Sequence, residues 1–244
     1  MNRAENVKAF VVHQRQYRET SSIVEFFTEH GLLSAVCRGV YGSGKAAGRL
    51  RGTLQPFGEL SLSWFGRGEL KTVRQVETIS TAPNLSYSVL YSGLYLNELL
   101  LRLAPSSEHE NGLYLLYKNT LQDLAALASD SVDINSSVEA ILRRFEIQLL
   151  EDLGFAIDFQ REWGEHTSIN EELHYSFDSG HGFTRCCAEA AGNRLRSIPG
   201  WVIMRIREAD FSDARVRRYA KQVVREALAP HLGDRPLRTR ELYS

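Results

Sequence analysis

Five short runs of apolar or alternating residues crowd the first eighty positions, and they constrain the fold more than any other feature. The runs cover residues 7–13, 22–28, 32–38, 53–65 and 70–77. Turn signals separate them, among them Gly31 after the second run and Gly66-Arg67-Gly68 after the fourth. Five strands with one long connection in the middle favour a small closed barrel of the OB type, and an SH3-like barrel is the competing architecture.

The long connection, residues 38–57, differs abruptly in composition from the runs on either side. It holds five glycines and no acidic residue, and its cations are Arg38, Lys45, Arg49 and Arg51. A segment of this composition cannot bury a core of its own, so we predict a mobile cationic arm, which suits a polyanion. A solvated surface loop is the alternative.

Further cations and aromatic rings accompany this arm. Arg15 and Arg18 lie near the end of the first strand region. The aromatic residues of the segment are Tyr17, Tyr41, Phe57, Trp64 and Phe65. Strand aromatics are more often buried than exposed, so Tyr17 and Tyr41, in polar surroundings, are the better candidates for stacking on nucleic-acid bases.

The net charge of -1 conceals an uneven distribution along the chain. Residues 1–80 carry 11 basic and 7 acidic side chains, residues 81–190 carry 6 and 17, and residues 191–244 carry 12 and 6. The two ends are cationic and the middle is acidic. A near-neutral total therefore leaves nucleic-acid binding open, because the local field steers a phosphate backbone.

Composition excludes several classes of protein. No apolar run is long enough to cross a membrane, and the N-terminus lacks the features of a secretory signal. Three cysteines, Cys37, Cys186 and Cys187, are an odd and sparse set, which argues against a disulfide framework and for a reducing cytoplasm. We find no GxxxxGK[ST], GxSxG or HExxH motif, so we expect no enzymatic activity.

After Pro83-Asn84 the period becomes helical. Apolar spacing predicts helices from residue 85 to Ala104-Pro105, over about 110–127 and over about 137–153, the last one ending at Gly154. Antiparallel helices with short links pack as a bundle. We therefore expect a multidomain α+β chain, with an OB-fold domain at 1–80 and a helical domain at 81–244.

The region from about 155 to 192 reads as irregular, with a short hairpin predicted at 173–177 and 182–186. Cys186 and Cys187 are adjacent, without a CxxC spacing, and no second cysteine pair lies upstream. The histidines here do not have the spacing of a structural zinc site, so we expect no bound metal and no cofactor.

A final helix is predicted from Ser212-Asp213 to about residue 232, with Gly233 as its cap. This helix and the tail after it form a second basic surface. Its members are Arg215, Arg217, Arg218, Lys221, Arg238 and Arg240.

The order of these pieces resembles the RecO family of bacterial DNA repair and recombination mediators. The strings that carry the resemblance are ETSSIVEFFTEHGLLSAVCRGVYGS, GTLQPF with GRGELKTVRQVE, LYSGLYLNELLLRL, LRRFEIQLLEDLGF and HLGDRPLRTREL. They extend over nearly the whole chain. Many members have a four-cysteine zinc site after the third helix, and this sequence looks like the branch that has lost it.

The resemblance implies binding of single- and double-stranded DNA and annealing of strands coated with single-strand-binding protein. It also implies assistance, with RecR, in loading RecA. In the family the C-terminal tail of single-strand-binding protein docks on the helical domain, and matching of the LRRFE string carries that contact to Arg143, with Ile147 as an apolar neighbour. An OB-type RNA-binding or translation-associated module is the alternative.

Overall fold

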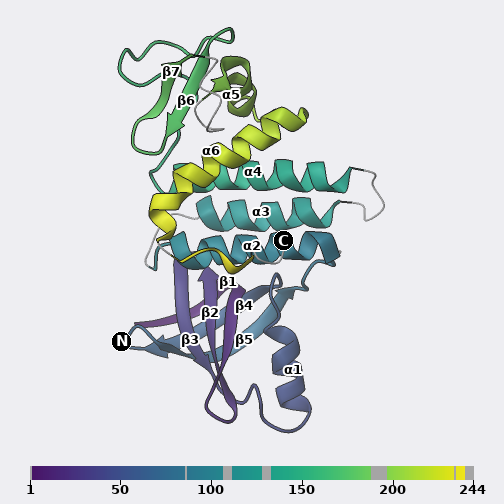
Figure 1. Ribbon diagram of the computed structural model, residues 1–244. Coiled ribbons are helices and arrows are strands. Elements are labelled where there is room, and N and C mark those ends of the chain that lie inside the picture. The colour runs from purple at the N-terminus through teal and green to yellow at the C-terminus, as the bar shows by residue number, and fades with distance from the viewer. Residues whose placement is uncertain are drawn as a thin grey trace. The chain divides into compact units, whose positions relative to one another are not determined.

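The computed structural model describes residues 2–85, 87–106, 112–127, 133–187, 197–233 and 235–239. Its first five strands are β1 (Asn2–Tyr17), β2 (Ser21–Thr28), β3 (Gly31–Cys37), β4 (Glu59–Gly66) and β5 (Lys71–Ser80). They close a barrel in the order β1-β2-β3-β5-β4, with β3 and β5 parallel (Figure 1). The OB-type barrel expected from the sequence is thus present.

Six helices and a second sheet complete the described elements. The helices are α1 (Lys45–Thr53), α2 (Tyr87–Leu103), α3 (Gly112–Ala125), α4 (Ile134–Asp152), α5 (Gly200–Arg207) and α6 (Ala214–Leu232). The strands β6 (His174–Asp178), β7 (Gly182–Cys186) and β8 (Ile198–Pro199) form a sheet in the order β7-β6-β8. The predicted helices after Pro83 and the predicted hairpin are confirmed, with shifts of a few residues at their ends.

The chain forms two compact units. The first unit contains residues 1–126 and 237–244, and the second contains Leu127–Pro236. Helices α2 and α3 therefore group with the barrel, whereas α4, α5, α6 and the small sheet form the second unit. In the second unit α6 crosses α4 (Figure 1).

Inward- and outward-pointing side chains alternate along the strands. The inward ones form the barrel core, and a second row of apolar side chains lies on the outside of the barrel. Val24 and Phe26 point inward and are fully buried. Phe27 and its cross-strand partner Phe10 point outward, and both rings contact Tyr117 of α3 in edge-on geometry, with centroids 5.8 and 5.1 Å away. Because β2 is apolar on both faces, its outer face at this end is covered by a helix.

The glycine-rich stretch is not the mobile arm that its composition suggested. Residues 45–53 form α1, although Gly48 and Gly52 lower its intrinsic helix propensity. Ala47 and Leu54 are buried, and Leu50 packs against the barrel core. These three residues share one helical face, so burial of that face, and not local propensity, holds the helix.

In the second unit, Gly200 is the point where α5 meets the loop before β6. Its amide donates to the carbonyl of Leu173 at 2.8 Å. A Cβ on Gly200 would lie 1.9 Å from the carbonyl oxygen of Asn170, so a side chain at this position requires a backbone shift. The absence of a side chain at Gly200 lets the loop close on the start of the helix.

The end of the described chain returns to the first unit and is held there by Glu98 of α2. Its carboxylate accepts hydrogen bonds from the amides of Arg238 and Thr239, both at 2.9 Å, and from the Thr239 hydroxyl at 2.7 Å. Arg102, one turn along α2, pairs with the same carboxylate at 3.0 Å. One half-buried side chain thus fixes the C-terminal segment.

We predict that this attachment weakens in acid. Burial alone would raise the pKa of Glu98, but the hydrogen bonds from Thr239 and Arg238 and the charge of Arg102 lower it below the ordinary 4.5. A lowered pKa means that the carboxylate stabilises the fold fully above about pH 4.5, and that this contribution is lost as the pH falls through the folded-state value. The protection of the Arg238 and Thr239 amides against hydrogen exchange, corrected for the slower intrinsic exchange in acid, should fall over that acidic range. In Glu98→Gln the exchange should be faster at neutral pH and lose this step, and an identical pH profile for both proteins would contradict the prediction.

Candidate nucleic-acid interface

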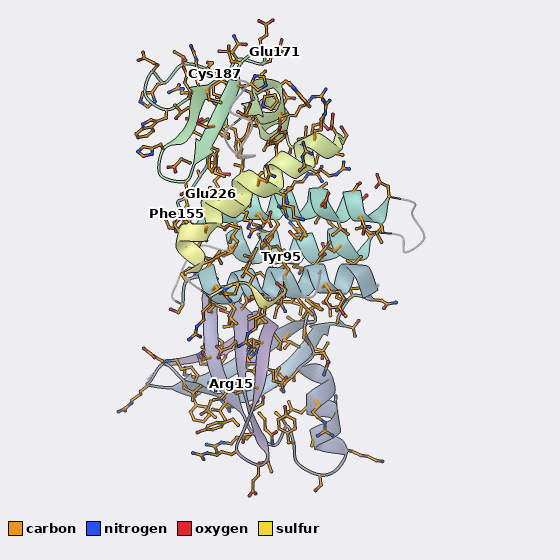
Figure 2. The ribbon with its side chains drawn as sticks, viewed as in Figure 1. Arg15, Tyr95, Phe155, Glu171, Cys187 and Glu226 are labelled. Atoms are coloured by element: carbon orange, nitrogen blue, oxygen red, sulfur yellow. The ribbon has the colours of Figure 1, made fainter. Side chains whose placement is uncertain are left out.

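Two connections at one end of the barrel bring three predicted cations together. The amide of Tyr41 donates to the carbonyl of Thr20 at 3.0 Å, which joins the segment after β3 to the β1–β2 turn. Arg18 lies in that turn and Arg38 directly follows β3, and both are exposed. Arg15 is exposed on β1, two residues before the strand ends (Figure 2). The fold therefore gathers cations that the sequence spreads over more than twenty residues.

Helix α1 adds three more cations. Lys45 and Arg49 are exposed and one turn apart, so they lie on the same face of the helix. Arg51 points back, and its guanidinium donates to the carbonyl of Val40 at 2.7 Å. This bond ties α1 to the segment that follows β3.

Six cations, Arg15, Arg18, Arg38, Lys45, Arg49 and Arg51, make up what we call the barrel cation surface. Among the described residues, none of the six forms an ion pair with an acidic side chain. Arg3 and Arg74 of the same barrel differ, because both pair with Glu5. The six are thus free of internal carboxylates that would compete with a phosphate.

Exposed aromatic rings accompany these cations. Tyr41 is 39% exposed, and the guanidinium of Arg18 lies 5.1 Å from the ring centroid of Tyr17, which is half-buried. Phe57 is buried at 6% exposure, but Phe65, which the sequence favoured as core, is 43% exposed. Phe65 directly precedes the Gly66-Arg67-Gly68 turn. This position at the end of a strand is the sequence feature that could have indicated its exposure.

Strand register places Phe65 in the same row as Arg15. Successive cross-strand partners run from Arg15 to Ile23, to Val36, to Thr72 and to Phe65. Directly paired residues project from the same face of a sheet, so this row follows the outer surface of the barrel. In OB folds the face of strands 2 and 3, with the loops after strands 1 and 4, binds oligonucleotides.

The last long helix carries the second predicted basic surface. Asp213 caps α6 by accepting from the amide of Arg215 at 2.7 Å. Arg215, Arg218 and Lys221 are exposed and spaced by three residues, so they form one stripe, which Arg225 continues one turn later. Arg215 also lies over the ring of Trp201, 4.7 Å from its centroid.

Two predicted members of that surface, Arg217 and Arg238, fall elsewhere. Arg217 does not face solvent, because its guanidinium donates to the carbonyls of Phe211 and Ser212 and to the Ser136 hydroxyl at 2.7–2.8 Å. Arg238 is exposed but belongs to the first unit, whereas α6 belongs to the second. Arg240 lies outside the described residues.

The predicted tail contact falls on a buried ion pair. Arg143 of α4 is 6% exposed, and its Nη2 lies 2.9 Å from Oε1 of Glu146, whose side chain is 1% exposed. Ile147 is half-buried on the following turn. A peptide carboxylate would therefore compete with Glu146 for this guanidinium.

Cys186 ends β7, and Cys187 directly follows it. Cys186 is half-buried and Cys187 is exposed. Burial, followed by the neighbouring Cys187, raises the pKa of Cys186. Within the described ranges, no three histidine, cysteine, aspartate or glutamate side chains lie close enough together to hold a metal ion.

No helix within those ranges has the length and apolar character that crossing a bilayer requires.

A cavity of about 370 Å³ lies between the barrel and α3 inside the first unit. Its wall includes Phe10, Phe57, Leu121 and Lys118. The Lys118 ammonium is already bonded to the buried Glu59 carboxylate at 2.8 and 2.9 Å. The ammonium of Lys118 is thus already neutralised within the cavity wall, and we assign no DNA to the cavity.

Comparison with known proteins identifies the family of the chain. The family model for "Recombination protein O N terminal" matches residues 1–82, and the model for "Recombination protein O C terminal" matches residues 85–241. The chain is 38% identical over 237 residues to a protein named DNA repair protein RecO in Proteus mirabilis (strain HI4320), which covers 97% of this chain and 91% of the relative. A protein of the same name in Yersinia pestis (strain Pestoides F) is also 38% identical, with 97% and 92% covered. The chain belongs to the RecO family of DNA repair and recombination proteins.

Proposed function

We propose that this protein binds single- and double-stranded DNA through the barrel cation surface and anneals complementary strands coated with single-strand-binding protein. With a RecR partner it would assist RecA loading. The observation that carries the proposal is a closed five-stranded barrel with six exposed cations that pair with no described acidic side chain. The activity involves no catalytic step, no metal and no cofactor.

Phosphate neutralisation supplies the affinity in this mechanism. Each contact between a cation and a phosphate releases counterions, so binding is independent of sequence and falls as salt rises. Unstacked bases lie against exposed rings, of which Tyr41 and Phe65 are the most accessible at the barrel. The surface therefore favours a strand whose bases are open for pairing.

The stripe on α6 provides a second place for a phosphate backbone. An annealing protein must hold two strands. A strand bound at the first cationic surface repels a second strand, and a separate cationic surface for the second strand lowers this repulsion. We assign this role to Arg218, Lys221 and Arg225. The middle of the chain is acidic, so the cationic surfaces available to DNA are those of the barrel and of α6.

Reversing the α6 stripe should reduce annealing more than binding. In the triple variant Arg218→Glu, Lys221→Glu and Arg225→Glu we expect about a tenfold slower annealing rate, because the second strand meets repulsion. Affinity for a short single strand, measured by fluorescence anisotropy, should change less than about threefold because the barrel cations remain. The control is Arg218→Lys with Arg225→Lys, which keeps the charge and should keep the rate. Equal loss of binding and annealing in the reversed variant would argue against two separate surfaces.

We assign docking of the tail of single-strand-binding protein to α4. It rests on the position of Arg143 and Ile147 in the LRRFE string. Because Glu146 already faces Arg143, the tail carboxylate must displace it or bind beside it. The half-buried Ile147 would contact an apolar side chain of the tail.

The deciding experiment is annealing of complementary oligonucleotides coated with single-strand-binding protein, with and without its C-terminal tail, over a salt series. Annealing that needs the tail and weakens with salt supports a mediator. A competing RNA strand of the same sequence tests the nucleic-acid class. Absence of DNA binding even at low salt, or preference for RNA, would overturn the proposal.

A further inference from the structure

Trp163 is an exposed indole in the second unit that DNA binding leaves unexplained. Its side chain is 54% exposed, the largest value among the exposed large hydrophobic residues that the structure describes. Its amide donates to the carbonyl of Phe183 on β7 at 2.6 Å, so its backbone is fixed to the hairpin. The rings of His181 and His166 approach it in edge-on geometry, with centroids 5.3 and 6.4 Å away.

The core beneath this indole is complete without it. Phe183 is 1% exposed and contacts Phe159 and Phe177, with ring centroids 5.7 and 4.9 Å apart. These three rings fill the space between the hairpin and the preceding loop. Trp163 therefore lies outside the core on a rigid support, the arrangement in which tryptophan serves as an anchor at protein interfaces.

The segment that carries Trp163 has a net negative charge. Residues 155–187 contain six acidic and two basic side chains. One of the two arginines, Arg185, is engaged with the buried Glu162 at 2.7 Å. Asp178 and Glu165 are exposed, and Asp178 bonds His181, whose ring contacts the indole, at 3.1 Å. This field repels a phosphate backbone and attracts cations.

We propose that Trp163, His166, His181, Asp178 and Glu165, which we call the Trp163 surface, dock a basic segment of a partner protein. An arginine or lysine of the partner lies over the indole face, where the cation and the ring attract each other, and the carboxylates of Asp178 and Glu165 pair with neighbouring cations. Charge complementarity selects this class of partner over nucleic acid. The surface is distinct from both cationic surfaces and does not depend on the proposed DNA binding.

The test measures binding of a fluorescein-labelled arginine-glycine peptide to the full chain by anisotropy. We expect saturable binding that weakens roughly tenfold in Trp163→Ala and about two- to threefold in Asp178→Asn, with partial retention in Trp163→Phe. The matched control is Phe155→Ala, which removes another exposed aromatic ring of the same unit, 46% exposed and stacked on His231. That control should bind as the unaltered chain does. Because Trp163 lies outside the core, circular dichroism should show Trp163→Ala folded.

Three outcomes would overturn the proposal. Equal peptide affinity in Trp163→Ala and in the unaltered chain would remove the indole from the contact. Binding of a glutamate-glycine peptide or of single-stranded DNA that depends on Trp163 would assign the surface to another class of ligand. Self-association that is lost in Trp163→Ala, seen by sedimentation without peptide, would make a second copy the occupant.

Discussion

Replacing Arg18, Arg38 and Arg49 together with alanine is expected to weaken binding of single-stranded DNA by about a hundredfold at low salt. The three side chains come from a turn, a strand end and a helix that the barrel brings to one surface, and none has an internal acidic partner among the described residues. Each lost phosphate contact lowers the slope of log affinity against log salt by about 0.7, so the slope should fall by about two. Anisotropy titrations between low and moderate salt measure both quantities.

The matched control removes two barrel cations that already form ion pairs within the protein. Arg3 and Arg74 are half-exposed, but both pair with Glu5. The double variant Arg3→Ala and Arg74→Ala should change affinity less than about twofold, because exposed ion pairs contribute little and these guanidinium groups are not free for phosphate. An equal loss in the control, or an unchanged salt slope in the triple variant, would show that the barrel cation surface is not the DNA site.

Arg143→Ala is expected to lower the free energy of unfolding of the second unit by about 3–5 kcal/mol. The substitution removes the guanidinium that lies 2.9 Å from the buried Glu146 carboxylate, and a buried charge that loses a hydrogen-bonded cation is costly. Urea unfolding and amide exchange along α4 measure the loss. Arg144→Ala, at the exposed neighbouring position, should cost less than about 1 kcal/mol. Similar losses in the two variants would contradict the prediction.

This pair also decides how tail binding must be tested. Loss of tail affinity in Arg143→Ala alone would not separate a missing contact from a damaged α4. The double variant Arg143→Met and Glu146→Met replaces the pair with apolar side chains, which often restores stability. A folded double variant that no longer binds the tail peptide would support a direct contact, and one that still binds it would leave Arg143 with a structural role only.

The strands and most helices were predictable because their signals are local. Alternation and turn residues marked the strands, and apolar spacing with Gly154 and Gly233 marked the ends of α4 and α6. The same reasoning failed for α1, where glycines and cations outnumber apolar residues. Leu50 and Leu54 hold that helix through contacts with the barrel core, and Ala47 is buried at the same helical spacing. Local propensity does not contain this information, because the strands of the core are distant in sequence.

The candidate site was predictable in composition but not in exposure. Sequence reasoning found the cations of residues 38–57, since that segment lacks acidic residues. It could not distinguish Arg217 and Arg143 from their exposed neighbours Arg218 and Arg144, because burial of an arginine depends on which helix faces it. Phe65 was missed for the opposite reason, since an apolar residue in a strand is usually covered.

The hydrogen bonds from Arg238 and Thr239 to Glu98 fix the order of folding steps during synthesis of this protein. The ribosome must add the whole second unit, Leu127–Pro236, between the synthesis of α2 and that of the segment that binds it. At about 5–20 residues per second this takes on the order of ten seconds. During that interval the barrel can collapse while the Glu98 carboxylate keeps its hydration. The attachment of residues 238 and 239 is therefore a late step in the folding of the first unit. A nascent chain stalled before this step would have a folded barrel, but its helix α2 would lack the contact with residues 238 and 239.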